Sequence, residues 1–328
     1  MRLLVLSRNA ALYSTSRLVL AARARGHEVS VIDPLDLQIA ISRGRPEMYL
    51  GAGPIPHADL VVPRIGASIT NYGLAVVRQF DMMGIPVLNT AVAIARSRDK
   101  LRSLQLLTRK DIDVPKTVCA RSPDSVGTAL QFIGGPPAIV KLQQGAQGIG
   151  TMIAETPAAV TSLLETLWAM GQDIILQEYI AESKGRDYRA IVVGGRLVAA
   201  MRRQAKKGEF RSNLHRGGAG VAVDLPDVYR RAAIDAARVM GLEVAGVDLL
   251  EGRDGPKILE INSSPGLEGI ERTSGVDVAG AIIAHAERIH QRRAKRGHDS
   301  GLDGERRKRR LMPAKSGKLE KPRRKGPL

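Results

Sequence analysis

The first 95 residues alternate short apolar runs with segments in which apolar residues recur at helical spacing. We interpret four of the runs as buried strands, at Leu3–Leu6, Val29–Ile32, Leu60–Pro63 and Pro86–Asn89. The segments that predict helices are Thr15–Arg25, which stops at Gly26, and Asn71–Met83. Strands separated by helices are typical of a parallel sheet with right-handed crossovers. The pattern therefore predicts a small parallel sheet at the start of the chain.

Helices and strands also alternate through the next part of the chain, around a glycine-rich loop at Gly145–Gly150. Apolar spacing predicts helices at 97–113 and Ala158–Met170. Short apolar runs predict strands at Thr117–Ala120, Ala138–Leu142, Met152–Ala154 and Ile174–Tyr179. The glycine-rich loop is therefore expected to join two strands.

Residues 187–262 are richer in strands, which we predict at Tyr188–Val193, Arg196–Met201 and Ile258–Ile261. The Gly194-Gly195 pair between the first two is a strong hairpin signal. Helices are predicted at Tyr229–Met240 and Val276–Gln291. Together with the chain length of 328 residues, this predicts an α/β protein of more than one domain.

Basic charge is concentrated at the C-terminal end of the chain. Residues 291–328 hold 15 Lys or Arg and 4 Asp or Glu, so they carry +11 of the net +17. The segment lacks apolar periodicity, and we expect it to be a disordered basic tail.

The compartment is predicted from the N-terminus and from cysteine content. The first apolar run has about four residues, whereas a signal peptide has an apolar core of roughly 7–15. No run approaches the ~18 apolar residues of a membrane span. Cys119 is the single cysteine, so no disulfide can form within the chain, and we interpret it as a small buried hydrophobe. A soluble, cytoplasmic protein is expected.

Common nucleotide and hydrolase motifs are absent, but a different set of phosphate-binding residues is present. The sequence has no G-x-x-x-x-G-K-[ST], no G-x-G-x-x-G after the first strand, no H-E-x-x-H and no G-x-S-x-G. Lys141 ends a predicted strand, and glycines follow at Gly145, Gly148 and Gly150. Glycines allow backbone N–H groups to approach phosphate oxygens closely, and the lysine supplies opposite charge. A plain hairpin turn is the alternative.

Oxygen ligands for a hard cation occur near the end of the predicted core. Glu260 and Asn262 are two apart on one strand and share a face, and Asp248 lies in an earlier apolar run. Such a set suits magnesium that also binds phosphates. The alternative is a carboxylate and an amide that fix a turn before Pro265.

Two further segments carry weaker signals. Gln177–Ile180 followed by Asp187 could hold a purine and a ribose, or could be an edge strand and a loop acid. Phe210–Gly218 contains two arginines, an asparagine and paired glycines, which indicates an anion-binding loop or simply solvated charge.

The order of these signals resembles the ATP-grasp superfamily, and particular strings resemble its RimK family. These strings are Asn89–Lys100, Phe210–Gly218, Ala245–Asp248 and Asn262–Glu271, and the resemblance covers residues 1 to about 290. It implies an ATP-grasp fold with an N-terminal Rossmann-like, pre-ATP-grasp parallel sheet. The expected parts are a pre-ATP-grasp domain at 1–95, a central lid subdomain at 96–186, a C-terminal subdomain at 187–290 and the tail at 291–328. Ala146 departs from the threonine that the family leads us to expect.

Site roles are implied by the same resemblance. Lys141, Arg211 and Asn213 would be catalytic. ATP would be held by Lys100, Lys141, Gly145, Gly148, Gly150, the backbone at Glu178 and Tyr179, Asp187, Arg211, Ser212 and Asn213. Two magnesium or manganese ions would be bound by Asp248, Glu260 and Asn262, with Glu260 bridging. Arg189, Arg203 and Ser264 would grip the amino-acid substrate.

The implied activity is ATP-dependent carboxylate–amine ligation through an acylphosphate. The resemblance implies that glutamate is added to the C-terminus of small-subunit ribosomal protein six, with free glutamate chains as a second product, by a homotetramer. The tail is expected to contact the ribosome or its RNA. Two alternatives stay open: a ligase of the same fold that acts on a metabolite or carrier protein, and an RNA- or ribosome-binding protein with a vestigial ATP site.

Overall fold

A computed structural model describes residues 1–44, 46–143, 150–183, 185–206, 209, 212 and 217–311, with side chains described as far as residue 295. Residues Met1–Glu287 form one compact unit and Arg288–Leu328 a second. The predictions for Gly145, Gly148, Arg211 and Asn213 lie outside the described residues.

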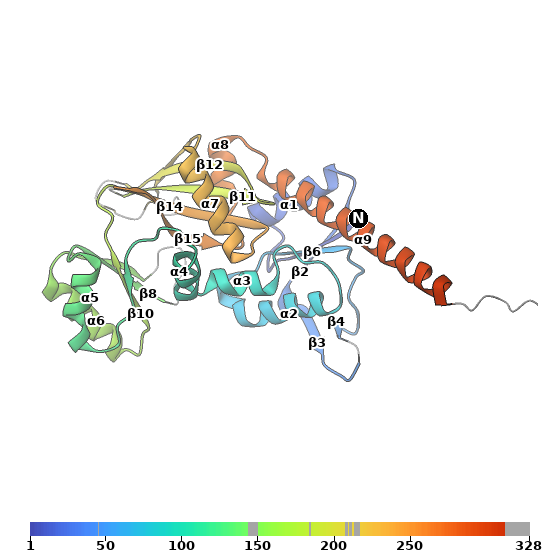
Figure 1. Cartoon of the computed structure of the whole chain (residues 1–328), viewed down its shortest axis with the longest axis horizontal. Helices are drawn as coiled ribbons and strands as arrows, with labels where there is room; N and C mark the ends of the chain where they lie inside the picture. The colour runs from blue at the N-terminus through green and yellow to red at the C-terminus, as the bar shows by residue number, and fades with distance from the viewer. Residues whose placement is uncertain are drawn as a thin grey trace, which may run out of the picture. The chain divides into compact units, whose positions relative to one another are not determined.

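The N-terminal sheet is parallel, as predicted, with strand order β2-β1-β6 (Figure 1). Its strands are β1 (Arg2–Leu6), β2 (Glu28–Ile32) and β6 (Leu60–Pro63), and its helices are α1 (Tyr13–Ala24) and α2 (Thr70–Met82). The predicted fourth strand at 86–89 is wrong, because only Val87 forms a bridge, to Val61. Pro86 has no N–H to donate, and Thr90 already caps the next helix by accepting from the N–H of Ala93.

A small antiparallel sheet in residues 37–54 was not predicted. Its strands are β3 (Leu37–Ala40), β4 (Glu47–Leu50) and β5 (Gly53–Pro54). They are short and half-exposed, so they lack the continuous apolar runs that mark the buried strands.

The predicted helix at 97–113 is shorter, α4 (Lys100–Thr108), and a further helix, α3 (Ala91–Arg98), precedes it without having been predicted. They are separated by Asp99, whose extended backbone ends α3 and whose side chain caps α4 by accepting from the N–H of Arg102 at 2.9 Å. The break places Lys100 at the first position of α4.

The middle sheet, which we define as the order β7-β10-β8-β9, is antiparallel. Its strands are β7 (Thr117–Val118), β8 (Ala138–Leu142), β9 (Thr151–Ala154) and β10 (Ile174–Glu178), and its helices are α5 (Val126–Ile133) and α6 (Pro157–Ala169). Cys119 is exposed rather than buried as expected, because β7 is an edge strand that ends one residue before it.

The largest sheet is antiparallel with the order β13-β12-β11-β14-β15, and α7 (Asp227–Met240) contributes to its core. Its strands are β11 (Arg186–Val193), β12 (Arg196–Gln204), β13 (Ala219–Ala222), β14 (Val244–Gly252) and β15 (Gly255–Asn262). Gly194 and Gly195 have φ of +59° and +73°, which is the geometry of a two-residue hairpin turn between β11 and β12.

Two helices complete the chain, α8 (Glu268–Ser274) and α9 (Val278–Leu311). The residues of α9 from Val278 to Ala286 include buried apolar side chains. The helix runs on to Leu311 instead of ending near Gln291 as predicted, because Arg, Lys and Glu favour helix even where apolar periodicity is lost. No helix in the described part of the chain combines the length and apolar character that a membrane crossing requires.

Candidate functional site

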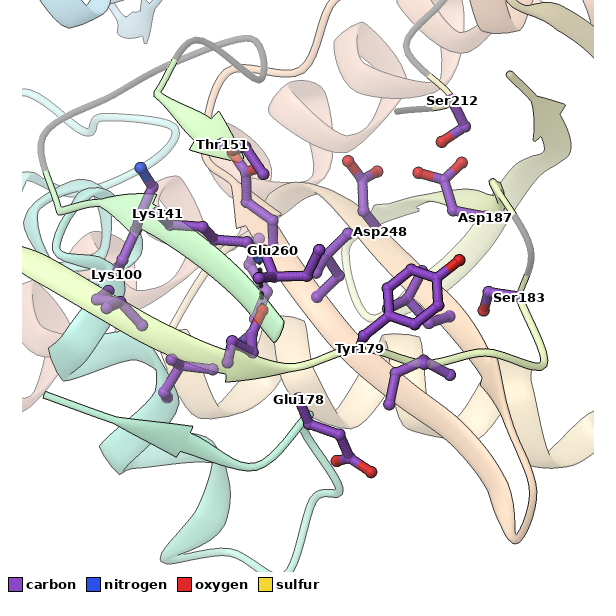
Figure 2. Close-up of a pocket in the computed structure, with 18 of the residues that line it drawn as sticks. Lys100, Lys141, Thr151, Glu178, Tyr179, Ser183, Asp187, Ser212, Asp248 and Glu260 are labelled. Carbon is purple, nitrogen blue, oxygen red and sulfur yellow. Dashed lines mark hydrogen bonds between the residues drawn. The ribbon is translucent and has the colours of Figure 1, made fainter. Parts of the chain in front are cut away.

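A pocket lies between the middle sheet and the largest sheet (Figure 2). The middle sheet contributes Lys141, Thr151 and Gln177, and the largest sheet contributes Asp248 and Glu260. Of the candidate site residues, the structure brings into this pocket Lys100, Lys141, Glu178, Tyr179, Asp187, Arg203, Ser212, Asp248 and Glu260. Residues that the sequence separates by up to 160 positions therefore line one cavity.

Two lysines form the cationic side of the pocket. Lys141 on β8 donates from Nζ to Oε1 of Gln177 at 2.6 Å, and Lys100 donates to the carbonyl of Leu142 at 2.9 Å. Burial lowers the pKa of Lys141 to about 8; the charge of Glu260 opposes this effect and that of Lys100 adds to it. Both lysines line this pocket, so a polyanion such as a triphosphate bound in it would meet two ammonium groups.

The three predicted metal ligands share one face of the β14–β15 pair. Asp248 opposes Glu260 directly across the strands, and Asn262 follows two residues after Glu260. In Figure 2, Glu260 lies between the two lysines and Asp248. Glu260 is exposed, and no described side chain pairs with its carboxylate at hydrogen-bonding distance.

Asp248 is held by arginines of neighbouring strands. Its oxygens accept from Nε and Nη2 of Arg189 at 2.8 and 2.7 Å and from Nη2 of Arg203 at 3.0 Å. Burial raises the pKa of Asp248, but the two arginines outweigh burial and hold the pKa at about 2. Three of about four lone-pair positions are occupied, so one remains for a further ligand.

Oxygen donors of this kind fit magnesium that is shared with phosphates. Among described residues, no three His, Cys, Asp or Glu side chains group as a metal site by themselves. The set Asp248, Glu260 and Asn262 therefore fits a cation that takes its other ligands from the nucleotide and water.

Asp187 belongs to the same buried network. Both its oxygens accept from Arg203, its cross-strand partner, one of them at 2.6 Å from Nε. Burial raises the pKa of Asp187, while Arg203 and a hydrogen bond from Ser212 lower it. Asp187, Arg203, Asp248 and Arg189 thus form a chain of alternating charge with no net charge.

The pocket also has an apolar lining, which suits a planar base. Its apolar wall is formed by Leu104, Leu107, Ile139, Ile175, Leu250, Leu259 and Ile261. Glu178 is fixed outside this wall, because its carboxylate accepts from the N–H of Lys116 at 3.0 Å and its own N–H donates to the carbonyl of Lys116 at 2.9 Å. The carboxylate of Glu178 is thereby held by the neighbouring strand.

A glycine is required at position 150 by the backbone conformation and by the close side chain of Leu142. It has φ of +75°, and a Cβ at this position would lie 2.7 Å from Cδ1 of Leu142. It ends the glycine-rich loop that follows Lys141, and its carbonyl accepts from the N–H of Leu142 at 2.9 Å.

Four of the described candidate residues are not part of the pocket lining, namely Gly150, Arg189, Asn262 and Ser264. Ser264 lies beside the N-terminal sheet, with Oγ 3.5 Å from the carbonyl of Pro63. The loop after Asn262 is held by α1, because the N–H of Leu267 donates to Oγ of Ser14 at 2.9 Å. Asn262 therefore lies where the end of β15 approaches the N-terminal sheet and α1.

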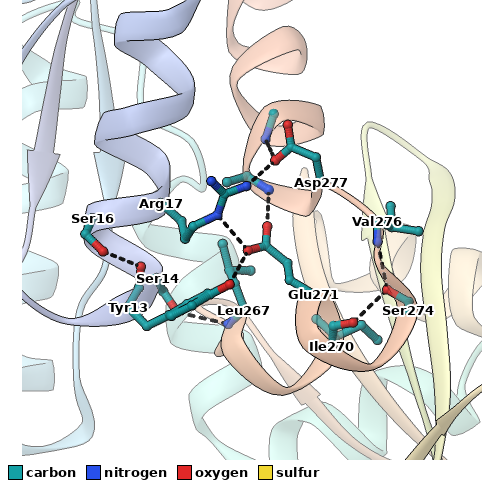
Figure 3. Close-up of polar contacts among 12 residues, drawn as sticks. Tyr13, Ser14, Ser16, Arg17, Leu267, Ile270, Glu271, Ser274, Val276 and Asp277 are labelled. Atoms are coloured by element: carbon teal, nitrogen blue, oxygen red, sulfur yellow. Dashed lines mark hydrogen bonds and ion pairs between the residues drawn. The ribbon is translucent and has the colours of Figure 1, made fainter.

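A polar cluster anchors this junction further along the chain. Figure 3 shows Tyr13 and Arg17 of α1 converging on Glu271 of α8, with O···O and N···O distances of 3.1 and 3.0 Å. The other oxygen of Glu271 accepts from the N–H of Ala279 at 2.9 Å. Arg17 also pairs with Asp277 at 2.9 Å.

Some pocket residues were not singled out from the sequence. Thr151, Ser183 and Arg186 all line it, and they lie outside the motifs that predicted the site. Gln177, which belongs to the predicted segment Gln177–Ile180, also lines the pocket. It positions Lys141 and donates in turn to Oγ1 of Thr117 at 2.9 Å.

Comparison with known proteins gives matches over nearly the whole compact unit. Residues 1–94 match the RimK PreATP-grasp domain, and residues 97–286 match the RimK-like ATP-grasp domain. A relative from Pseudomonas paraeruginosa, named "Probable alpha-L-glutamate ligase", is 54% identical over 288 residues, which is 88% of this chain and 96% of that protein.

Solved structures of lower identity share the fold. The ATP-grasp ligase PsnB, complexed with a precursor variant, Mg and ADP, has a TM-score of 0.67 at 23% identity and covers 87% of this chain and 98% of its own. A RimK domain protein from Sphaerobacter thermophilus has a TM-score of 0.64 at 24% identity, with coverage of 87% and 99%. At these identities the likeness concerns the fold, and it agrees with the predicted ATP-grasp architecture.

Proposed function

The chain belongs to the RimK family of ATP-grasp ligases and is an ATP-dependent ligase, and we propose that it joins glutamate to a carboxylate through a peptide bond. In the first step the acceptor carboxylate attacks the γ-phosphorus of ATP, and the bond to the β-phosphate bridging oxygen breaks to release ADP. In the second step the amine of glutamate attacks the acyl carbon, and inorganic phosphate leaves as the amine loses a proton.

The arrangement of charge around Glu260 carries the proposal. Lys100 and Lys141 face it from one side, and the neutral network that includes Asp248 lies on the other. A triphosphate bound here would meet two ammonium groups, while Asp248, Glu260 and Asn262 would hold magnesium. Magnesium bound there would supply neutralisation of the phosphate charge that develops in phosphoryl transfer.

The chain's own residues orient the reactants. Lys141 is fixed by Gln177, and the apolar wall would stack the base, so the γ-phosphate is placed at the acidic strand pair. The roles of Lys100, Gly145, Gly148, Gly150, Asp187, Arg211, Ser212 and Asn213 in nucleotide binding are part of this proposal. No protein nucleophile is required.

We further propose that the acceptor is the C-terminus of small-subunit ribosomal protein six. The name of the relative supports glutamate as the added amino acid, and family membership supports a protein acceptor. The basic segment from Gln291 would bring the enzyme to ribosomal RNA.

The test is to incubate the purified full chain with magnesium, ATP and glutamate, with and without the ribosomal protein. ADP release and mass increments of glutamate on the protein C-terminus are expected. ADP release with free glutamate chains as the only product would contradict the acceptor. A metabolite or carrier-protein acceptor would appear only when that acceptor is supplied, and no ADP with any acceptor would favour an RNA-binding protein with a vestigial ATP site.

A further inference from the structure

Two arginines lie where the carboxyl end of the N-terminal sheet meets the loop after β15. Arg64 directly follows β6, and its Nη2 donates to the carbonyl of Pro265 at 2.7 Å. Arg98 is the last residue of α3 and donates from Nη2 to the carbonyl of Ile65. The carboxyl ends of parallel strands are where open sheets bind ligands. The two guanidinium groups therefore occupy an edge suited to a binding site.

Neither arginine is neutralised by the described part of the chain. Each is seen to donate to one backbone carbonyl, although a guanidinium has five N–H donors, and no described carboxylate lies within ion-pair distance of Arg64 or Arg98. Burial lowers the pKa of Arg64 to about 10, and the like charge of Arg98 adds to the effect. Two partly buried cations without a counter-ion would be stabilised by a bound anion.

Other cations near the site are already engaged. Arg189 and Arg203 bind Asp248 and Asp187, so their charge is cancelled within the protein. Lys100 and Lys141 line the nucleotide pocket, whereas Arg64 and Arg98 do not. Among the described cations, Arg64 and Arg98 are thus two that lie outside the nucleotide pocket and have no carboxylate partner.

The pair is close to the reacting end of the site. Arg98 ends α3 two residues before Lys100, which lines the pocket, and the charge of Glu260 opposes the effect of burial, which lowers the pKa of Arg98. Arg64 contacts Pro265, three residues after Asn262. An anion bound by Arg64 and Arg98 would lie near the same end of β15 as the γ-phosphate, on the side of the N-terminal sheet.

We propose that Arg64 and Arg98 bind the carboxylates of the amino acid that attacks the acylphosphate, a dicarboxylic amino acid such as glutamate. This inference rests on the proposed ligase function. The attacking amine must be neutral, so the reactive form of glutamate carries two negative charges, which two guanidinium groups match. The acceptor carboxylate does not require the pair, because it is joined to the phosphoryl group beside the lysines.

The test compares Arg64→Lys and Arg98→Lys with Arg78→Lys, an exposed arginine on α2. Lysine keeps the charge and removes the planar fork, and thermal unfolding of each variant checks the fold. Two reactions are measured with the full chain: ligation of glutamate to the acceptor, and hydroxamate formation from acceptor, ATP and hydroxylamine without any amino acid. The second reaction reports the acylphosphate step alone.

Loss of a charged hydrogen bond predicts that KM for glutamate rises about ten- to hundred-fold in both test variants. Hydroxamate formation and KM for ATP are expected to stay at the wild-type value, and Arg78→Lys to behave as wild type throughout. The kcat/KM for glutamine relative to that for glutamate should also rise in the test variants. An unchanged KM for glutamate, or a rise in KM for the acceptor instead, would overturn the assignment. If wild-type protein forms neither ADP nor hydroxamate with any acceptor, the ligase function itself fails, which is a different result.

Discussion

Asp248 and Glu260 face each other across β14 and β15, yet within the described part of the chain Asp248 has arginine partners and Glu260 has none. Asp248 is buried and accepts from two arginines, whereas Glu260 is exposed to the pocket and has lysines near it without contact. Asp248 is thus held in place by the protein and has one position left for a ligand, whereas both oxygens of Glu260 are available to ligands.

The difference predicts separate effects on activity and stability. Glu260→Gln should abolish ADP release while leaving the melting temperature unchanged, because no described partner is lost. Steady-state ADP release and thermal unfolding measure the two quantities. Glu165→Gln, at an exposed position on α6, is the matched control. Full activity in Glu260→Gln would refute the role of Glu260 as a metal ligand.

Lys141 predicts how nucleotide use depends on pH. Its pKa is lowered to about 8, so the ammonium is lost as pH rises through 8, and kcat/KM for ATP should fall by about tenfold per pH unit above it. Lys141→Arg keeps its charge in this range and should lack that decline. A decline that persists in Lys141→Arg would assign it to another group.

The junction between α1 and α8 predicts a large loss of stability on substitution. Glu271→Ala leaves Arg17 and the N–H of Ala279 without their acceptor, and we expect the free energy of unfolding to fall by about 2–3 kcal/mol. Glu268→Ala on the same helix removes an exposed pair with Arg272 and should cost about 0–1 kcal/mol. Denaturant unfolding of both variants measures the difference, and equal losses would show that burial does not matter here.

Glu287 predicts a stability difference that depends on pH. Hydrogen bonding to Arg25 is the largest cause that lowers its pKa from 4.5 to about 2, and His27 contributes. A carboxylate with a lowered folded pKa stabilises fully above its unfolded pKa, and the contribution is lost as pH falls from 4.5 towards 2. The gap in melting temperature between wild type and Glu287→Gln should therefore be full at pH 7, shrink below pH 4.5 and close as pH falls to about 2. A gap that is constant over this range would contradict the assignment, and Glu155→Gln, at an exposed position, is the control.

The basic C-terminal segment predicts salt-dependent binding to ribosomes. Deletion of 292–328 should weaken co-sedimentation with ribosomes most at low salt, because released counter-ions supply the binding free energy. ADP release with isolated acceptor should be unchanged. Equal co-sedimentation of both proteins at every salt concentration would leave the segment without a role in targeting.

The sequence predicted elements that are long, apolar and buried, and it failed where structure depends on distant contacts. The strand at Leu60–Pro63 was placed correctly, since all four of its residues are buried. The short sheet at 37–54 was missed, because its pairing is half-exposed and carries no apolar run.

In the candidate site, too, local spacing could be predicted and contacts between distant residues could not. That Glu260 and Asn262 share one face of a strand could be predicted from strand periodicity. The bonding of Arg203 to both Asp187 and Asp248 could not, because it depends on the order and register of strands, and Arg203 and Asp248 are 45 positions apart. Sequence alone therefore suggested Arg203 as a substrate ligand, whereas its donors are used within the protein.

The apolar core of the middle sheet consists only of residues from the middle sheet and its own helices, α5 and α6. The core around α7 and the core of the N-terminal sheet are separate clusters. We therefore expect that a tilt of the middle sheet as a rigid body would open the pocket and leave these three clusters packed. Nucleotide entry and ADP release would then require only a rotation of the middle sheet and no unfolding, so a deep pocket would not by itself slow ADP release.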